Sequence, residues 1–196
     1  MPTFLVGLPG LLAFGAGILF FFAALLAARH RAKPPKTADS RRDPRSIKWI
    51  VLQGLGIFIA GFGPIRLALD PFSAKALIDG VVVLALMAAA VALFDWSSRT
   101  MGHNWALVAR TRGDGNLVTN GPFALVRNPI YVALALFMVA MAVAYGHVLN
   151  LALAIPAYGF ATYMRVRSEE RVLREAFGAA YDAYTARVKR FVPGLF

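Results

Sequence analysis

Two adjacent carboxylates with a nearby arginine are the residues of this sequence best suited to chemistry. Glu169 and Glu170 follow a long apolar block, and Arg165 stands one helical turn before Glu169. Residues four apart share a helix face, so Arg165 should pair with Glu169 and Glu170 with Arg174. Such pairs are commonly exposed surface ion pairs. Their place beside an apolar block, near a membrane surface, suits instead a site for a charged ligand, because carboxylates bind cations and arginine binds anions.

A second group of polar residues lies in the long connection 97–129. Its motifs are GHNW at 102–105, RTRGDGN at 110–116, LVTNGPF at 117–123 and VRNPIY at 126–131. Gly121-Pro122 is a turn signal. Pro129 suits the first turn of a following helix, with Asn128 as its N-cap. On these local patterns alone, the segment also fits plain turn-and-cap structure with Arg127 as an interfacial anchor.

Apolar residues also recur at helical spacing in the C-terminal segment. The repeating positions are Leu173, Phe177, Tyr181, Tyr184 and Val188. They predict an apolar stripe that packs on the rest of the protein or lies in the membrane interface. Gly178 is expected to break the helix.

The elements that must position these residues are membrane-spanning helices. The chain of 196 residues is 59% hydrophobic and 16% charged, with a mean hydropathy of +0.61, which is outside the range of soluble domains. A bilayer core requires about 20 apolar residues as helix. Five blocks qualify: about 4–28, 47–69 with Pro64 kinking its far end, 76–96, 130–145 and 147–164. The sequence predicts an all-α integral membrane helical bundle of about five transmembrane helices, the last two forming a tight antiparallel hairpin.

Lysine and arginine alternate in number along the connections between these blocks. Segments 29–48, 97–129 and 165–196 hold eight, four and seven, whereas segment 70–75 holds one and the turn at Gly146 holds none. Cytoplasmic connections carry the excess of Lys and Arg. The pattern therefore predicts an N-terminus outside, five spans and a cytoplasmic C-terminal helical tail.

The formal net charge of +11 is explained by this topology, so we do not expect nucleic acid as a partner. A basic cytoplasmic rim would also attract anionic membrane lipids. Cysteine is absent from the sequence, which excludes disulfides and thiolate chemistry. The three histidines, His30, His103 and His147, lack metal-ligand spacing, so no metal is expected.

At these motifs the sequence resembles the isoprenylcysteine carboxyl methyltransferase and phospholipid methyltransferase group of integral membrane enzymes. The resemblance covers about residue 97 to the C-terminus. It is carried by the loop motifs above and by R-x-x-x-E-E-x-x-L at 165–173, F-G-x-x-Y-x-x-Y at 177–184 and R-F-x-P at 190–193. The apolar blocks themselves place three N-terminal transmembrane helices over 1–96, with a basic cytoplasmic loop at 29–48, and the resemblance concerns the rest of the chain. The catalytic region would be 97–196, with a cofactor loop at 97–129, a transmembrane hairpin at 130–164 and the tail at 165–196.

The resemblance implies methyl transfer from S-adenosylmethionine to a lipophilic acceptor from the bilayer, at the cytoplasmic face. The acceptor stays open between a prenylcysteine-type carboxylate, a phospholipid amine and a small thiol. The cofactor-binding residues it implies are Leu117, Val118, Gly121, Arg127, Asn128, Tyr131, Glu169 and Glu170. The catalytic residues it implies are Arg165, Glu169 and Glu170, with Arg165 binding an anion of the substrate.

One position departs from the carboxyl methyltransferases of this group, which have His where this chain has Asn128. Asparagine can donate and accept hydrogen bonds but does not titrate near neutral pH. The difference argues against a general base at this position and against a narrow assignment to prenylated proteins.

Two other function classes fit part of the sequence. A membrane sterol-type reductase using NADPH has a similar C-terminal architecture, although such enzymes are usually longer. A non-enzymatic small membrane protein would need functional polar groups at mid-membrane. The candidates Gln53, Asp79, Asp95 and Asn150 stand singly or near span ends, which disfavours this class. The sequence predicts neither the oligomeric state, nor the route of substrate entry, nor the role of the first three spans with their Phe20–Phe22 run.

Overall fold

The computed structural model describes residues 4–32, 46–105 and 116–194. These ranges contain six α-helices and three short 3-10 segments, without named strands. The helices are α1 (Leu8–Arg31), α2 (Ser46–Gly61), α3 (Ala74–Met101), α4 (Pro129–Ala144), α5 (Leu151–Phe177) and α6 (Ala179–Arg187). The predicted all-α bundle is confirmed. That five of its helices cross a membrane stays a prediction.

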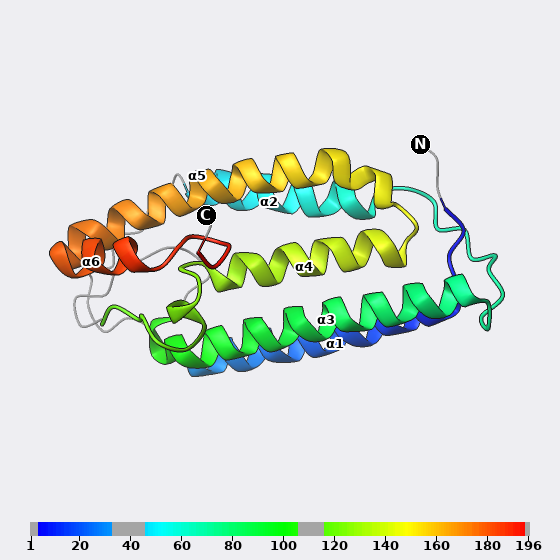
Figure 1. Cartoon of the computed structure of the whole chain (residues 1–196), viewed down its shortest axis with the longest axis horizontal. Helices are drawn as coiled ribbons and strands as arrows, with labels where there is room; N and C mark the ends of the chain where they lie inside the picture. Colours follow the sequence, from blue (N-terminus) through cyan, green and yellow to red (C-terminus); the bar gives the residue numbers. More distant parts are fainter. Residues whose placement is uncertain (1–3, 33–45, 106–115, 195–196) are drawn as a thin grey trace.

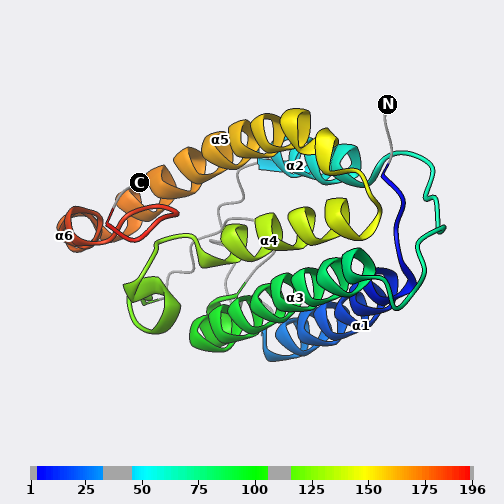
Figure 2. The same ribbon diagram turned by 45° about the vertical axis from the view of Figure 1, so that its right-hand side comes forward.

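The five long helices lie lengthwise beside one another in three layers (Figures 1 and 2). Helices α1 and α3 form one outer pair, α2 and α5 form the other, and α4 lies between the two pairs. The helices alternate in direction, so the ends of α1 and α3, the start of α4 and all of α6 gather at one end of the bundle, on the left in Figure 1.

Glycines allow the helices of each outer pair to approach closely. A Cβ on Gly17 of α1 would lie 2.7 Å from the Met87 side chain of α3. A Cβ on Gly56 of α2 would lie 2.9 Å from the backbone nitrogen of Tyr158 in α5. Small residues at such crossings are the usual means of tight packing between membrane helices.

Large apolar side chains cover the outside of the bundle. Leu19 is 72% exposed and Val81 is 67% exposed. In the most apolar 18-residue stretch of α1, and likewise of α3, only 28% of the residues are buried. Both helices are long and apolar enough to cross a membrane, and α2 and α4 are shorter apolar helices. A soluble protein rarely leaves this many large apolar side chains in water. The surface is that of a membrane protein.

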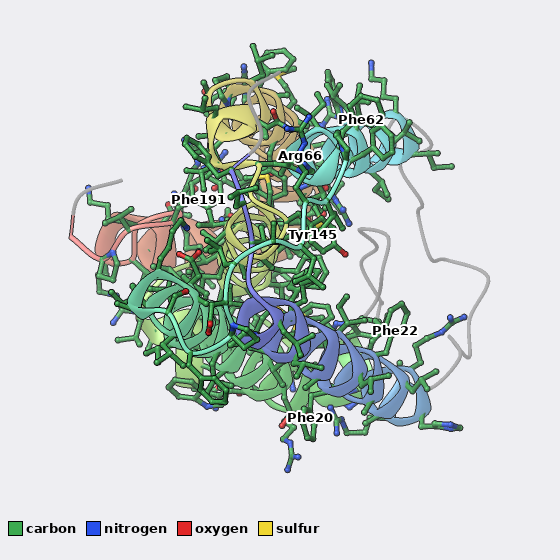
Figure 3. All side chains as sticks on the ribbon, turned by 90° about the vertical axis from the view of Figure 1, so that its right-hand side faces the viewer. Phe20, Phe22, Phe62, Arg66, Tyr145 and Phe191 are labelled. Atoms are coloured by element: carbon green, nitrogen blue, oxygen red, sulfur yellow. The ribbon has the colours of Figure 1, made fainter. Side chains whose placement is uncertain are left out.

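The phenylalanine run of α1 divides between the outside and the core. Phe20 and Phe22 are exposed, and Figure 3 shows them on opposite sides of α1. Phe21 turns inward, with its ring centroid 4.8 Å from that of Phe94 and 5.4 Å from that of Phe137. Phe21 thus anchors helix α1 on α3 and α4, whereas the residues on either side of Phe21 in the sequence are exposed.

Helix α2 is shorter than the sequence predicts. The expected span to Leu69 with a kink at Pro64 is wrong, because the helix ends at Gly61 and Pro64 lies in irregular chain. The last carbonyls of a helix need donors from outside it. Asn150 Nδ2 donates to the carbonyl oxygens of Ile59 (2.9 Å) and Phe62 (2.8 Å). The ring nitrogens of His147 lie 3.2 Å from two more carbonyls in this segment.

The last two long helices also differ from expectation. The connection after α4 is short, turning at Gly146 with φ of +72° and a 3-10 segment, Val148–Asn150. However, α5 packs mainly on α2 and only lightly on α4, so the two arms are not a closely packed hairpin. Helix α5 also continues without a break past residue 164 to Phe177, so the tail begins within the helix that precedes it.

Candidate functional site

Glu169 lies in a buried cluster between α4 and α5. Its Oε1 accepts a hydrogen bond from the Tyr131 hydroxyl at 2.6 Å and forms an ion pair with Arg165 Nε at 3.1 Å. The side chains of Arg165 and Glu169 are only 9% and 19% exposed. The predicted pairing of Arg165 with Glu169 is confirmed. The pair is mostly buried and is not an exposed surface ion pair.

Arg165 is held from a third helix. Its Nη1 donates to Oε1 of Gln53 in α2 at 2.9 Å, and Gln53 Nε2 donates to the Thr162 hydroxyl at 2.8 Å. The guanidinium carbon lies 5.1 Å from the centroid of the Tyr131 ring, within cation–π range. Helices α2, α4 and α5 therefore all contribute to the Glu169 cluster, which consists of Gln53, Tyr131, Thr162, Arg165 and Glu169.

Tyr131 is itself held in place by a neighbouring tyrosine. The Tyr158 hydroxyl donates to the Tyr131 backbone oxygen at 2.8 Å, across the light contact between α5 and α4. Pro129 occupies the first turn of α4, as predicted, which places Tyr131 near the beginning of that helix. The start of α4 is thereby fixed beside the Glu169 carboxylate.

Glu170 points into a different cluster. Arg190 donates to both of its carboxylate oxygens, Nε to Oε1 at 3.0 Å and Nη2 to Oε2 at 2.7 Å. Arg127 Nη1 lies 3.2 Å from Oε1, and the Glu170 side chain is 10% exposed. The predicted pair of Glu170 with Arg174 is wrong, because Arg174 pairs with Asp182 of α6 at 2.7 Å.

Backbone bonds reinforce this second cluster. The backbone N–H of Arg127 donates to the carbonyl of Lys189 at 2.8 Å, and that of Asn128 donates to Arg190 at 3.1 Å. The Asn128 side chain also donates to the Arg190 carbonyl, at 3.3 Å. Asn128 precedes α4 as predicted, yet its side chain does not cap the helix. Its amide holds the C-terminal segment instead. We call Arg127, Asn128, Glu170 and Arg190 the tail clasp.

The C-terminal apolar residues cover the loop below the site. Gly178 breaks the helix as predicted, with φ of +50°, so the stripe is divided between α5 and α6. Tyr181 and Tyr184 are buried, and the Tyr184 hydroxyl donates to the carbonyl of Phe123 at 2.7 Å. Burial raises the pKa of both phenols to about 12, so they stay protonated hydrogen-bond donors at neutral pH.

The charge state of Glu169 reflects opposing influences. Burial raises the pKa of its carboxyl, and the nearby Glu170 carboxylate adds to this effect. The Arg165 guanidinium and the Tyr131 hydroxyl counteract the rise, because both stabilise the carboxylate. The net result is a pKa above that of an ordinary glutamate. Glu169 thus combines a short hydrogen bond, an ion pair and restricted access to water.

The remaining predicted cofactor residues lie in the loop before α4. Gly121 turns the chain with φ of +58°, and a Cβ there would meet the Thr100 hydroxyl of α3 at 2.8 Å. Its role in the structure is to let this loop close onto the end of α3. Leu117 and Val118 are half-buried in the same loop. The glycine-rich part of the expected cofactor loop at 106–115 lies outside the described residues.

Two members of the Glu169 cluster, Gln53 and Thr162, were not predicted from the sequence as site residues. Gln53 stands in the sequence as a single polar residue of an apolar block, but its side chain is buried and its amide is hydrogen-bonded at both ends. An amide inside an otherwise apolar helix was the available signal. Of the other isolated polar residues, Asp79 pairs with Lys75, and Asp95 pairs with Arg31 and Arg99. Asn150 is buried and binds the carbonyls that end α2.

A sequence model of the phospholipid methyltransferase family matches residues 78–180, just over half of the chain. The chain belongs to this family. The match confirms the resemblance noted in the sequence and supports an enzyme of the membrane methyltransferase class. A search of curated proteins found no match to the chain. Arg127, Asn128, Tyr131, Arg165, Glu169 and Glu170 all lie within the matched region, whereas Gln53 and Arg190 lie outside it.

Proposed function

We propose that this protein transfers a methyl group from S-adenosylmethionine to a lipophilic acceptor at the cytoplasmic face of a membrane. Membership of the phospholipid methyltransferase family supports the reaction class. The observation that carries the proposal is the buried pair of Glu169 and Arg165, with opposite charges 3.1 Å apart beside the start of α4.

The chemistry of this pair fits the charges of the cofactor. S-adenosylmethionine has cationic sulfonium and ammonium groups and an anionic carboxylate, and when bound it supplies an already activated methyl group. Glu169 offers a carboxylate to a cationic group, and the Arg165 guanidinium offers N–H donors to a carboxylate or to an anionic acceptor. Charge-assisted bonds of this kind are strongest where water is scarce, as at these two side chains.

The other residues of the cluster keep the pair in place. Tyr131 donates to Glu169 Oε1 and lies against the Arg165 guanidinium, which restricts both side chains. Tyr158 in turn fixes the backbone at Tyr131. Alignment of reacting groups and exclusion of water are the main requirements that a methyl transfer places on its protein. The tail clasp, by contrast, fastens the C-terminal segment over the loop that leads into α4.

The acceptor would enter from the bilayer, because α2 and α5 present apolar side chains to the outside on either side of the site. Arg165 favours an acceptor with an anionic group. The family description makes a phospholipid amine the first acceptor to test, followed by a prenylcysteine-type carboxylate and a small thiol.

Calorimetric titration of the detergent-purified protein tests the cofactor assignment. We expect saturable binding of S-adenosylmethionine and of its demethylated product, and none of NADPH. A folded sample that binds neither methyl donor nor product would refute the proposal. Binding of NADPH instead would favour a reductase.

A further inference from the structure

Gln53 lies in the apolar helix α2, in the part of the chain that the family match does not cover. A buried amide in such a helix is unfavourable unless its polar atoms are bonded. Both ends of this amide are hydrogen-bonded, because Oε1 accepts from Arg165 and Nε2 donates to Thr162. The bonds are 2.9 and 2.8 Å long and span more than one hundred residues of sequence.

The orientation of this amide is determined by its partners. A guanidinium can only donate, so the amide oxygen must face Arg165 and the amide nitrogen must face Thr162. Arg165 is then held at two nitrogens of its planar fork, Nη1 by Gln53 and Nε by Glu169. Two bonds to a planar group fix its direction as well as its position.

We propose that Gln53 is a positioning residue of the site: it holds the Arg165 guanidinium, and through it the Glu169 carboxylate, so that α2 completes a site otherwise built from α4 and α5. This inference rests on the proposed function. It gives the N-terminal half of the chain a part in cofactor binding that its apolar sequence does not reveal.

The same two hydrogen bonds would also form if Gln53 served only to hold α2 against α5. The two roles predict different effects when the amide is removed. If Gln53 only holds the helices together, removing its amide would loosen the packing of α2 on α5 and have no further effect. Loss of a positioning residue would also raise the pKa of Glu169 further, because a displaced Arg165 stabilises its carboxylate less. Apart from Arg165, the charged or titratable groups that act on Glu169 are Tyr131 from α4, which faces it, and its neighbour Glu170, which points away and remains paired with Arg127 and Arg190.

The test compares Gln53→Met, which keeps the length of the side chain and removes both bonds, with two other variants. Thr162→Val removes one partner but leaves Gln53 next to Arg165. Asn150→Ala loosens α2 from α5 at the opposite end, where Asn150 binds the carbonyls that end α2. For each variant, the thermal midpoint and the S-adenosylmethionine dissociation constant would be measured from about pH 4 to pH 8, upward from the ordinary glutamate pKa of about 4.3.

We expect Gln53→Met to weaken binding about tenfold at neutral pH and to move the loss of binding on acidification to higher pH. Thr162→Val should have a smaller effect. Asn150→Ala should lower the thermal midpoint and leave the pH profile in place. Wild-type affinity and pH profile in Gln53→Met, or an equal shift in Asn150→Ala, would overturn the inference. Failure of the wild-type protein to bind would instead contradict the proposed function, and the role of Gln53 with it.

Discussion

Glu169 and Glu170 are neighbours in the sequence, yet the structure places them in separate environments. Glu169 faces Tyr131 and Arg165 inside the bundle, and Glu170 joins Arg127 and Arg190 in the tail clasp. Adjacent helical residues point about 100° apart, so both environments can be reached from one helix. From the sequence alone the two carboxylates were interchangeable members of one site. Their different partners now predict different effects of the same substitution.

Glutamine at each position should distinguish these roles. Glu169→Gln removes a charge from the proposed cofactor site, so we expect at least tenfold weaker S-adenosylmethionine binding. The thermal midpoint should fall as well, because the buried Arg165 loses its counter-charge. Glu170→Gln weakens bonds to two arginines, which should destabilise the fold by about 1.5–3 kcal/mol. Calorimetry and thermal unfolding in detergent measure the two effects. Equal losses of S-adenosylmethionine affinity in the two variants would contradict the division.

The raised pKa of Glu169 predicts a pH dependence of binding. A cationic ligand needs the carboxylate, and protonation removes it. Because burial raises the pKa, protonation on acidification begins at a higher pH than for an ordinary glutamate near about 4.3. Affinity for S-adenosylmethionine should therefore fall as the pH drops through this raised value. The residual binding of Glu169→Gln serves as the control and should lack this step.

Among the helices, the apolar pattern of the sequence predicted that the elements exist but not how they pair. Long blocks of apolar residues gave α1 and α3 to within a few residues. The end of α2 was misplaced because Pro64 and the residues around it are apolar, and the groups that terminate the helix, Asn150 and His147, come from a distant connection. The pairing of α2 with α5 depends on small residues and on Gln53, whose partners lie more than one hundred residues away.

Two glycines of α2 test the close approach of this helix to α5. A Cβ at Gly56 would lie 2.9–3.0 Å from backbone and side-chain atoms of Tyr158, whereas a Cβ at Gly54 would meet no atom within 4 Å. Gly56→Ala should therefore destabilise the protein by about 1–3 kcal/mol through overpacking. Gly54→Ala should be neutral or slightly stabilising, since alanine favours helix. Equal thermal midpoints for the two variants would show that the helices do not approach as described.

For the molecule as a whole, the distribution of charge predicts its orientation. The connections richest in lysine and arginine join helix ends that lie at the α6 end of the bundle, and the connections between helix ends at the opposite end hold few. The prediction from sequence therefore remains that the N-terminus is outside and the C-terminus cytoplasmic. The chain lacks cysteine, so single cysteines can report on this orientation without background.

Phe72→Cys and Arg187→Cys would place a thiol at exposed positions of the two ends. In right-side-out membrane vesicles, a membrane-impermeant maleimide should label the cysteine at position 72 and not the one at 187. In inside-out vesicles the labelling should reverse. The opposite pattern would invert the topology and place the proposed site on the outer face.

Transfer of a labelled methyl group is the reaction on which the proposed function stands or falls. Purified protein would be incubated with methyl-labelled S-adenosylmethionine and lipid vesicles that contain a primary-amine phospholipid, with Glu169→Gln as the control. We expect label in the organic-soluble fraction with the wild-type protein and at least tenfold less with the variant. If the wild-type protein binds the cofactor but a prenylcysteine or a thiol receives the label, methyl transfer stands and the acceptor changes. Label in none of these acceptors, from a folded protein, would refute methyl transfer as the function of this chain.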